Sequence, residues 1–361
     1  MNTKIGTTTM VRFLAGAAFL LGLGVLLAGC SSGPSPAART GGGRSDLPEW
    51  YLDPGSVYPD NTYLASVGTG DTRRAAEQQA MAGLSQTFEA NIQVDMRTQE
   101  RYRDIVTAQG TFSEADVQLA QTTNVQSAQT LLNIQFGEAA VDENGRVHAI
   151  AYIERLPTGR VYQELIQKNG RQVESFLREA DNSNDVIREY AFVSAAGIIA
   201  TNNEVLRNQL MIIAPALGQM VSVPYNYDAL LQRRTDIASG MRVAVSLTGD
   251  DGDRVGGVLR QALNQERFPV STDNPVLTVT GRVQIEPIDL NPDFESVRWV
   301  LNLNMAGPNG SSLVSFDDQG RSSAVTTESA IAFAYRDMQE AVERNFVGAM
   351  RRYFDGLVLG N

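Results

Sequence analysis

The first hydrophobic segment of the chain is an apolar run from Phe13 to Leu27. Lys4 and Arg12 precede this run, and no acidic residue comes before it. A membrane-spanning helix needs about 20 apolar residues, so the run is short for one. A basic start, a short apolar run and small residues after it are typical of a secretory signal peptide. We therefore predict a signal peptide over residues 1–29.

A polar segment of low complexity follows. Residues 31–44 contain only Gly, Ser, Pro, Ala and Thr, apart from two arginines. Such a composition cannot bury enough apolar surface to fold, and Gly/Ser-rich segments behave as flexible linkers. We therefore expect a flexible tether over residues 30–46.

The next segment changes from a strand pattern to a helix pattern. Residues 63–67 form a short apolar run, which predicts a strand, and residues 73–90 carry apolar side chains four positions apart, which predicts a helix with one buried stripe. Asp71 or Thr72 is the expected N-cap. The stripe consists of Ala76, Ala80, Leu84 and Phe88.

The turn Gly68-Thr69-Gly70 connects this strand to this helix. A dinucleotide-binding fingerprint requires a third glycine three residues further on, but Arg73 occupies that position. No Gly-Lys-Ser/Thr of a phosphate-binding loop follows either. We interpret the glycines as a tight turn, and the alanines as a helix surface that packs closely on a sheet.

Three further elements are predicted before residue 157. Residues 91–102 alternate apolar and polar side chains, which predicts a strand with one buried face. Residues 113–116 (Ser-Glu-Ala-Asp) resemble a capping box and should begin a short helix. Strand-like runs at 130–141 and 146–153 flank Asp142-Glu143-Asn144-Gly145, and Asn-Gly is a strong hairpin signal.

Residues 157–215 predict an antiparallel helical hairpin with a break at residues 181–184. Residues 208–227 carry no formal charge over 20 positions, so a membrane span has to be considered. Pro215 and Pro224, together with four Asn and Gln side chains, argue against it. We expect a buried helix end followed by an extended linker.

From residue 241 the pattern predicts a second sheet. A strand over residues 241–247 precedes an amphipathic helix over residues 253–265. A long helix over residues 327–357 closes the chain, and Pro308-Asn309-Gly310 is a turn between strands. Further strands are predicted at 268–271, 276–285, 297–305, 312–316 and 321–325.

These elements predict an α+β fold in which two small sheet-plus-helix domains are joined by a helical hairpin, after a signal peptide and a flexible tether. The predicted segments are the signal peptide 1–29, the tether 30–46, a first domain 47–157, a helical hairpin and linker 158–235, and a C-terminal domain 236–361.

Composition limits the chemistry. The chain has a single Cys and a single His, which excludes an intrachain disulfide and a zinc site of the common Cys/His type. The formal charge of −11 becomes −13 when Lys4 and Arg12 leave with the signal peptide. Nucleic-acid affinity comes mainly from Lys and Arg that neutralise phosphates, so we expect no nucleic-acid partner. We likewise expect no cofactor and no metal.

The signal peptide ends in Leu27-Ala28-Gly29-Cys30. This sequence resembles the lipobox of bacterial lipoproteins. The resemblance implies diacylation of the Cys30 sulfur, cleavage before Cys30, and acylation of the new amino group, for example by palmitate. Several acyl chains together would anchor the protein stably in a membrane. Ser31 stands where an Asp would imply retention at the inner membrane, so the resemblance implies an outer-membrane lipoprotein facing the periplasm.

The first domain carries Pro48-x-Trp50, then Tyr63-x-x-x-Val67-Gly68-x-Gly70, then the alanine-spaced helix, then a long predicted strand. This pattern resembles the "lipoprotein twenty" family of small bacterial envelope lipoproteins, and is similar to the first domain of a flagellar outer-ring assembly protein. The resemblance implies a non-enzymatic α+β module with no catalytic residues. The second domain resembles, by its order of elements, small α+β domains of periplasmic assembly lipoproteins.

Few residues are candidates for chemistry. His148 lies on a predicted strand, and we interpret it as a structural or surface histidine rather than part of a catalytic triad. Asp250-Asp251-Gly252-Asp253 lacks the ligand spacing of a calcium loop, and we interpret it as a turn with Asp253 as N-cap. Asp289, Asp293 and Glu295 form a second, solvated acidic loop. The aromatic residues Trp50, Tyr51, Tyr58 and Tyr63 either line a groove or pin the N-terminal segment onto the core.

The sequence therefore predicts a non-enzymatic envelope lipoprotein. It is tethered to the membrane through covalent lipid on Cys30 and provides protein–protein contacts in envelope or motility-apparatus assembly. The identity of its envelope protein partners is open. The alternatives are a surface-exposed adhesin or antigen and, with less support, an enzyme acting on cell-wall glycan.

Overall fold

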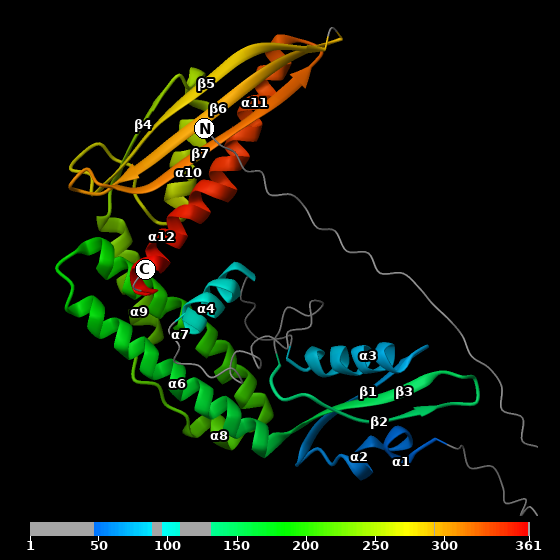
Figure 1. Ribbon diagram of the computed structural model, residues 1–361. Coiled ribbons are helices and arrows are strands. Elements are labelled where there is room, and N and C mark those ends of the chain that lie inside the picture. Colours follow the sequence, from blue (N-terminus) through cyan, green and yellow to red (C-terminus); the bar gives the residue numbers. More distant parts are fainter. Residues whose placement is uncertain (1–46, 89–95, 109–130, 292, 360–361) are drawn as a thin grey trace, which may run out of the picture. The chain divides into compact units, whose positions relative to one another are not determined.

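The computed structural model describes residues 47–88, 96–108, 131–291 and 293–359. Its elements form an α+β fold with two sheets, as predicted (Figure 1). Cys30, the tether, the capping box at residues 113–116 and the strand residues Ile92 and Val94 lie outside the described residues. The predicted domain boundaries stay a prediction.

The first sheet has three antiparallel strands in the order β1-β3-β2. They are β1 (Tyr63–Gly70), β2 (Gln135–Val141) and β3 (Val147–Glu154). Helix α3 (Arg73–Gln86) packs on one face of this sheet, and the short helices α1 (Glu49–Leu52) and α2 (Pro54–Val57) lie on the other (Figure 1). The predicted strand, helix and hairpin of this region are confirmed.

Helix α3 packs very closely on β1 because both surfaces are made of small residues. Ala76 and Ala80 have no exposed surface, and a Cβ atom on Gly68 would lie 2.2 Å from the carbonyl oxygen of Ala76 and 2.2 Å from the backbone nitrogen of Ala80. The Thr72 side chain accepts a hydrogen bond from the Ala75 N–H, which makes Thr72 the N-cap. The interpretation of the alanines as a closely packing helix surface is therefore confirmed. The turn predicted at Gly68-Thr69-Gly70 is wrong, because these residues continue strand β1 and Gly68 serves the close approach of α3 instead.

The strand predicted at residues 91–102 is wrong where the structure describes it, because Met96–Ala108 form a helix, α4. Tyr102, Ile105 and Val106 are buried at helical spacing in the larger of the two hydrophobic cores. Arg101 also pairs with Asp355, 254 positions away in the sequence. Long-range packing of α4 thus outweighs a weak local alternation of apolar and polar residues.

The predicted helical hairpin is confirmed as α6 (Arg155–Asp181) and α7 (Val186–Ile213), two long antiparallel helices (Figure 1). Every residue of α7 from Tyr190 to Ala200 is buried, because α6, α4, α9 (Tyr227–Gly240) and α12 (Val347–Leu359) surround this stretch. The uncharged segment that follows contains the short helix α8 (Pro215–Met220). Within the described part of the chain, no helix combines the length and hydropathy that crossing a bilayer requires.

The second sheet has the strand order β4-β5-β6-β7. Strand β4 (Val243–Thr248) pairs in parallel with β5 (Leu277–Asn291) after a crossover through α10 (Arg254–Gln265). Strands β5, β6 (Phe294–Ala306) and β7 (Ser312–Ala324) are antiparallel. The closing helix is divided into α11 (Thr327–Ala341), a π-helical turn (Val342–Phe346) and α12.

The two strands predicted at 312–316 and 321–325 are one strand, β7. The sequence pattern failed because the middle of β7 has no large apolar residue on its inner face. There, Trp299 of β6 lies over Gly320, with its ring 2.5 Å from the position of an added Cβ, and Ser322 donates a hydrogen bond of 2.8 Å to Asp337 of α11. The strand predicted at 268–271 contributes only an isolated bridge from Val270 to Val243.

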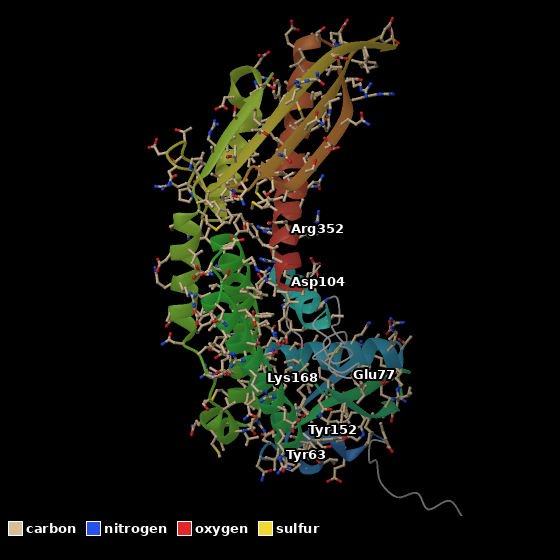
Figure 2. The ribbon with its side chains drawn as sticks, turned by 60° about the vertical axis from the view of Figure 1, so that its left-hand side comes forward. Tyr63, Glu77, Asp104, Tyr152, Lys168 and Arg352 are labelled. Atoms are coloured by element: carbon tan, nitrogen blue, oxygen red, sulfur yellow. The ribbon has the colours of Figure 1, made fainter. Side chains whose placement is uncertain are left out.

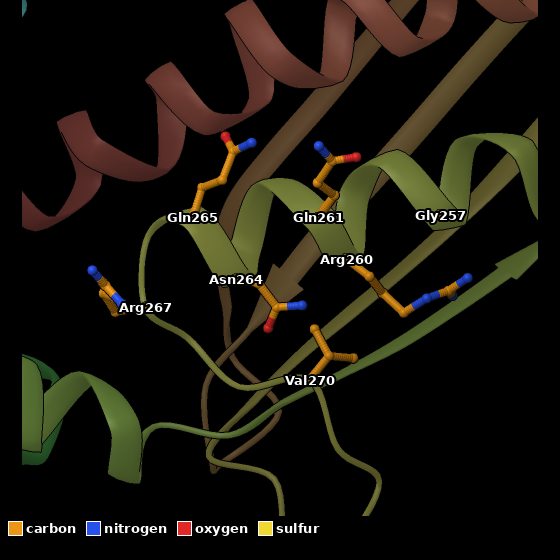
Figure 3. A pocket seen from close by; sticks show the side chains of 7 residues that line it. All are labelled: Gly257, Arg260, Gln261, Asn264, Gln265, Arg267 and Val270. Atoms are coloured by element: carbon orange, nitrogen blue, oxygen red, sulfur yellow. The ribbon is translucent and has the colours of Figure 1, made fainter.

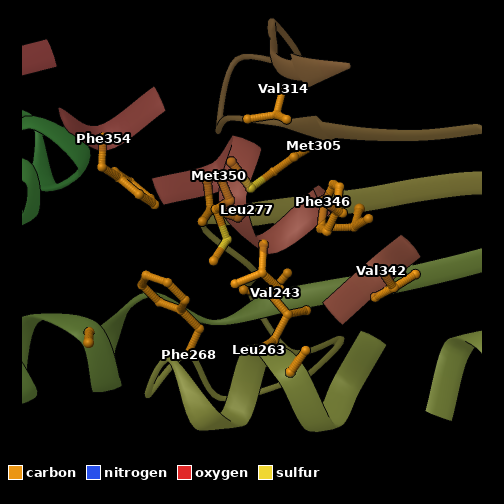
Figure 4. Close-up of a cluster of buried hydrophobic side chains, with 14 of the residues drawn as sticks. Val243, Leu263, Phe268, Leu277, Met305, Val314, Val342, Phe346, Met350 and Phe354 are labelled. Atoms are coloured by element: carbon orange, nitrogen blue, oxygen red, sulfur yellow. The ribbon is translucent and has the colours of Figure 1, made fainter. Parts of the chain in front are cut away.

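The hydrophobic residues form two clusters. The larger one fills the space between the second sheet, α10, α11 and α12, where Phe268, Phe346 and Phe354 lie among Leu, Val and Met side chains (Figure 4). The smaller one joins α3 and β3 to the helix pair through Leu84, Ile153 and other residues. Helices α6 and α7 contribute to both clusters, so the helix pair is shared between the cores.

The acidic turn before α10 caps this helix through a residue other than the expected one. Asp253 has a left-handed backbone (φ 57°), and its side chain pairs with Arg260 instead of capping the helix. The Asp250 carboxylate accepts hydrogen bonds from the backbone N–H groups of Val255 (3.1 Å) and Gly256 (2.8 Å). The predicted Asp253 N-cap is therefore wrong, because the chain turns once more before the helix begins.

Replacement of Asp250 by alanine is expected to lower the free energy of unfolding by about 1 kcal/mol, the usual effect of losing a capping side chain. Asp253→Ala is the matched control, since the Asp253 side chain is 61% exposed and its ion pair is worth less than about 0.5 kcal/mol. Urea denaturation followed by circular dichroism measures both variants. Equal losses in the two variants would contradict the assignment of the cap.

Candidate functional site

His148 is the only imidazole of the chain, and the structure places it among groups that a catalytic triad could use. Its Nδ1 atom lies 2.9 Å from the Thr69 hydroxyl, and its Nε2 atom lies 3.2 Å from an Asp142 carboxylate oxygen. Thr69 comes from β1, His148 from β3, and Asp142 from the turn between β2 and β3. Sequence spacing alone does not reveal this grouping, because Thr69 is 79 positions away from His148.

The Asp142 carboxylate is held by the hairpin turn itself. One of its oxygens accepts hydrogen bonds of 2.9 Å from the backbone N–H groups of Asn144 and Arg146. The Arg146 N–H is the largest influence on this carboxyl group, and together with His148 it lowers the pKa of Asp142. Gly145, at φ 77°, closes the turn, as the Asn-Gly signal predicted.

The surroundings of His148 are those of a structural histidine. The residue is only 3% exposed, and the Tyr51 ring lies over it at 4.2 Å between ring centroids. The imidazole therefore links α1 to strand β1 and to the hairpin turn, with both ring nitrogens engaged. Of the two alternatives for His148, structural or surface, the structure supports the structural one.

The aromatic residues near the start of the domain pack on one another. The Tyr58 ring lies 5.4 Å from the Tyr63 ring and 4.8 Å from the Tyr152 ring, and Tyr63 lies 5.8 Å from Tyr152. Figure 2 labels Tyr63 and Tyr152 in this layer, below α3 and the sheet. Trp50 is 7% exposed and contacts Tyr51 edge to face at 6.2 Å. These rings pin α1 and α2 onto the sheet, which was one of the two interpretations of the cluster.

The segment that contains His148 and the tyrosine layer also matches a known protein family. Residues 48–154 match the model described as LPP20 lipoprotein. This segment is an LPP20 lipoprotein domain. It covers the layer of α1 and α2, the three-stranded sheet and α3, so His148 and the tyrosine layer belong to the LPP20 domain. The "lipoprotein twenty" resemblance of this region is confirmed.

Other comparisons are more distant. No curated protein matches the chain. A secreted protein of the human pathogen Helicobacter pylori is similar with a TM-score of 0.41 and 11% identity, over 78% of this chain and 96% of that one. A minor lipoprotein of Acinetobacter baumannii is similar with a TM-score of 0.24 and 13% identity, over 32% of this chain and 91% of that one.

Arg155, which sequence reasoning did not single out, connects the LPP20 domain to the helix pair. Its Nε atom donates to the backbone carbonyls of Asp60 (2.6 Å) and Tyr63 (3.2 Å). Its Nη1 atom donates to the carbonyls of Ile212 (2.9 Å) and Ile213 (3.0 Å), the last two residues of α7. One guanidinium thus satisfies helix-end carbonyls and holds the start of β1.

The acidic clusters take part in local structure. Asp250 caps α10, and Glu295 accepts a hydrogen bond of 3.1 Å from Thr327. Across the described ranges, no three His, Cys, Asp or Glu side chains come together in a way that could hold a metal ion.

The outer surface of α10 has a shallow groove lined by polar side chains (Figure 3). Arg260 lies along this groove and pairs with Asp253. Arg267 lies at the end of the helix, apart from Arg260 in the same view. The lining residues are Gly257, Arg260, Gln261, Asn264, Gln265, Arg267 and Val270. The groove is open, and two of its lining residues, Gln265 and Arg267, also line a small polar cavity.

Proposed function

We propose that this chain is a non-enzymatic lipoprotein that is anchored by lipid on Cys30 in the outer membrane, faces the periplasm, and provides protein–protein contacts in envelope or motility-apparatus assembly. The observation that carries the proposal is the coincidence of an LPP20 lipoprotein domain with a single cysteine directly after Leu27-Ala28-Gly29. Only a cysteine sulfur can form the thioether that carries the lipid, and the chain has no other cysteine.

The interior of the LPP20 domain supports a structural rather than a catalytic role. His148 is covered by Tyr51, and its two nitrogens contact Thr69 and Asp142. A catalytic base needs access to the substrate proton within hydrogen-bond distance. The buried imidazole instead stabilises the packing of α1 on the sheet.

The Cys30→Ser variant is expected to lose the lipid, because a hydroxyl does not replace the thiol in the thioether. Intact-mass spectrometry of the wild-type protein purified from bacterial membranes should show a chain that begins at Cys30 and carries acyl groups. The variant should retain residues 1–29 and carry no acyl mass. Ser31→Ala is the matched control and should behave as the wild type.

A third variant and a protease experiment test the location and the orientation of the protein. Ser31→Asp is expected to move the lipidated protein to the inner-membrane fraction of a density gradient, whereas Ser31→Ala stays in the outer-membrane fraction. Protease added to intact cells should leave the folded part uncut. An unmodified Cys30 contradicts the anchor, and cleavage on intact cells contradicts the inward orientation and favours an adhesin or antigen.

A further inference from the structure

A small polar cavity lies where four helices of the described structure meet. Its walls come from α4, α7, α9 and the end of α10, and its volume is ≈ 130 Å³. Roughly 10–15 Å³ of such volume holds one water molecule, so the cavity has room for a small polyatomic ion. It is below the ≈ 300 Å³ of typical pockets for larger ligands.

Three arginines line this cavity: Arg101, Arg234 and Arg267. Arg101 is neutralised by Asp355, through bonds of 2.9 Å from Nε and 2.7 Å from Nη2. Among the described wall residues only Glu266 is acidic, and it is paired with Arg351. Among the described residues, neither Arg234 nor Arg267 has a carboxylate partner. The cavity therefore has two uncompensated positive charges in a chain of net charge −11.

Tyr190 and Ser194 of α7 add neutral hydrogen-bonding groups. Tyr190 is 8% exposed, and its ring is fixed edge to face against Phe268 (5.1 Å) and Phe354 (4.9 Å). Burial raises the pKa of the Tyr190 hydroxyl, although Arg234 acts in the opposite direction, so the hydroxyl stays protonated at neutral pH. Ser194 of the same helix also lines the cavity.

Arg267 reaches the cavity at a conformational cost. It follows the C-cap of α10 and has a φ of 68°, in the left-handed region that is normally occupied by glycine. A side chain there is sterically disfavoured relative to a right-handed position. The turn is closed by hydrogen bonds from the Arg267 N–H to Asn264 and from the Phe268 N–H to Leu263, both of 3.0 Å. Residues held in such conformations often belong to binding sites.

We propose that this cavity binds a phosphate group, with Arg234 and Arg267 as the charged ligands and Tyr190 and Arg101 as further donors. A phosphate group carries about −1.5 to −2 charges at pH 7, which matches the two unpaired guanidinium groups. Guanidinium groups suit oxyanions because they present several donors in one plane. This site lies outside residues 48–154, the LPP20 domain, except for Arg101, and does not depend on the lipid anchor.

Isothermal titration of the full-length, detergent-solubilised protein in a phosphate-free buffer tests the proposal. Inorganic phosphate is expected to bind with saturable heat at one site. Arg234→Gln and Arg267→Gln should each weaken binding about tenfold, the effect of losing one charge-assisted hydrogen bond of ordinary strength. The double variant should show no saturable heat.

Arg260→Gln is the control, because Arg260 lies on α10, seven residues before Arg267, but outside the cavity. It should bind phosphate as the wild type does, and circular dichroism should show that all variants are folded. Glycerol 3-phosphate distinguishes the source of the ligand: binding of both compounds indicates the phosphate end of a larger molecule, and binding of inorganic phosphate alone indicates the free ion. Absence of binding of both compounds, or folded Arg234→Gln and Arg267→Gln variants that bind normally, would overturn the proposal.

Discussion

Gly68→Val is expected to destabilise the LPP20 domain by more than about 3 kcal/mol. An added Cβ atom at residue 68 would stand 2.2 Å from two backbone atoms of α3, the Ala76 oxygen and the Ala80 nitrogen. Overpacking a core usually costs about 1–3 kcal/mol when side chains can adjust. Backbone atoms in the middle of a helix cannot move aside, so the whole of α3 would have to shift from β1.

Gly257→Ala is the matched control for this substitution. Gly257 lies inside α10, and an added Cβ atom there meets no other atom within 4 Å. Alanine is favoured over glycine inside a helix by about 0.5–1 kcal/mol, so this variant should be slightly more stable than the wild type. Urea denaturation measures both. A Gly68→Val variant within 1 kcal/mol of the wild type would show that α3 does not lie as close to β1 as described.

Arg155→Met is expected to lower the free energy of unfolding by about 2–4 kcal/mol. The substitution removes four hydrogen bonds from one charged group to the carbonyls of Asp60, Tyr63, Ile212 and Ile213. A charge-assisted hydrogen bond contributes about 1.5–3 kcal/mol to stability. Because Arg155 is partly exposed to water, its four hydrogen bonds together contribute well below four times that value. The positive charge also lies at the C-terminal end of α7, where the helix dipole favours it.

Two further variants, Arg155→Lys and Arg160→Met, separate the effect of the positive charge of Arg155 from the effect of its geometry. Arg155→Lys keeps the charge but cannot reach both pairs of carbonyls, so it should recover only part of the loss. Arg160→Met changes an exposed arginine of the same helix and should have little effect. Thermal unfolding, together with amide hydrogen exchange at the start of β1 and the end of α7, measures the three variants. Equal stability of Arg155→Met and Arg160→Met would refute the role of Arg155.

Patterns of apolar and turn residues correctly predicted those helices and turns that are formed by interactions between residues close together in the sequence. The stripe of Ala76, Ala80 and Leu84 predicted α3, although the helix ends at Gln86 instead of residue 90. The Asn144-Gly145 turn predicted the hairpin, because glycine readily adopts the left-handed conformation that the turn needs. The long apolar patterns of α6 and α7 predicted the helix pair in the same way.

Two of the wrong predictions fall where a distant residue decides the local structure, and a third falls at a turn with a left-handed residue. Helix α4 is stabilised by the pairing of Arg101 with Asp355 of α12, and β7 continues past Asp318 and Gly320 because Trp299 covers it. The Asp253 cap was wrong because Asp253 adopts a left-handed backbone and Asp250 reaches the helix instead. Neither a pairing across 254 positions nor a single left-handed residue leaves a periodic pattern in the sequence.

The candidate sites also fall into two groups, those that the sequence reveals and those that only the structure reveals. The lipidation of Cys30 is a proposal that rests on sequence alone, because processing enzymes read a linear motif and Cys30 lies outside the described residues. The arginine cavity and the contacts of Arg155 could not be found from the sequence, because their members are scattered from residue 60 to residue 267. Helix α3, the hairpin turn and the helix pair depend mainly on neighbours along the chain, so the sequence by itself determined them. Sites assembled from several elements depend on which side chains meet in space, and only the tertiary structure decided that.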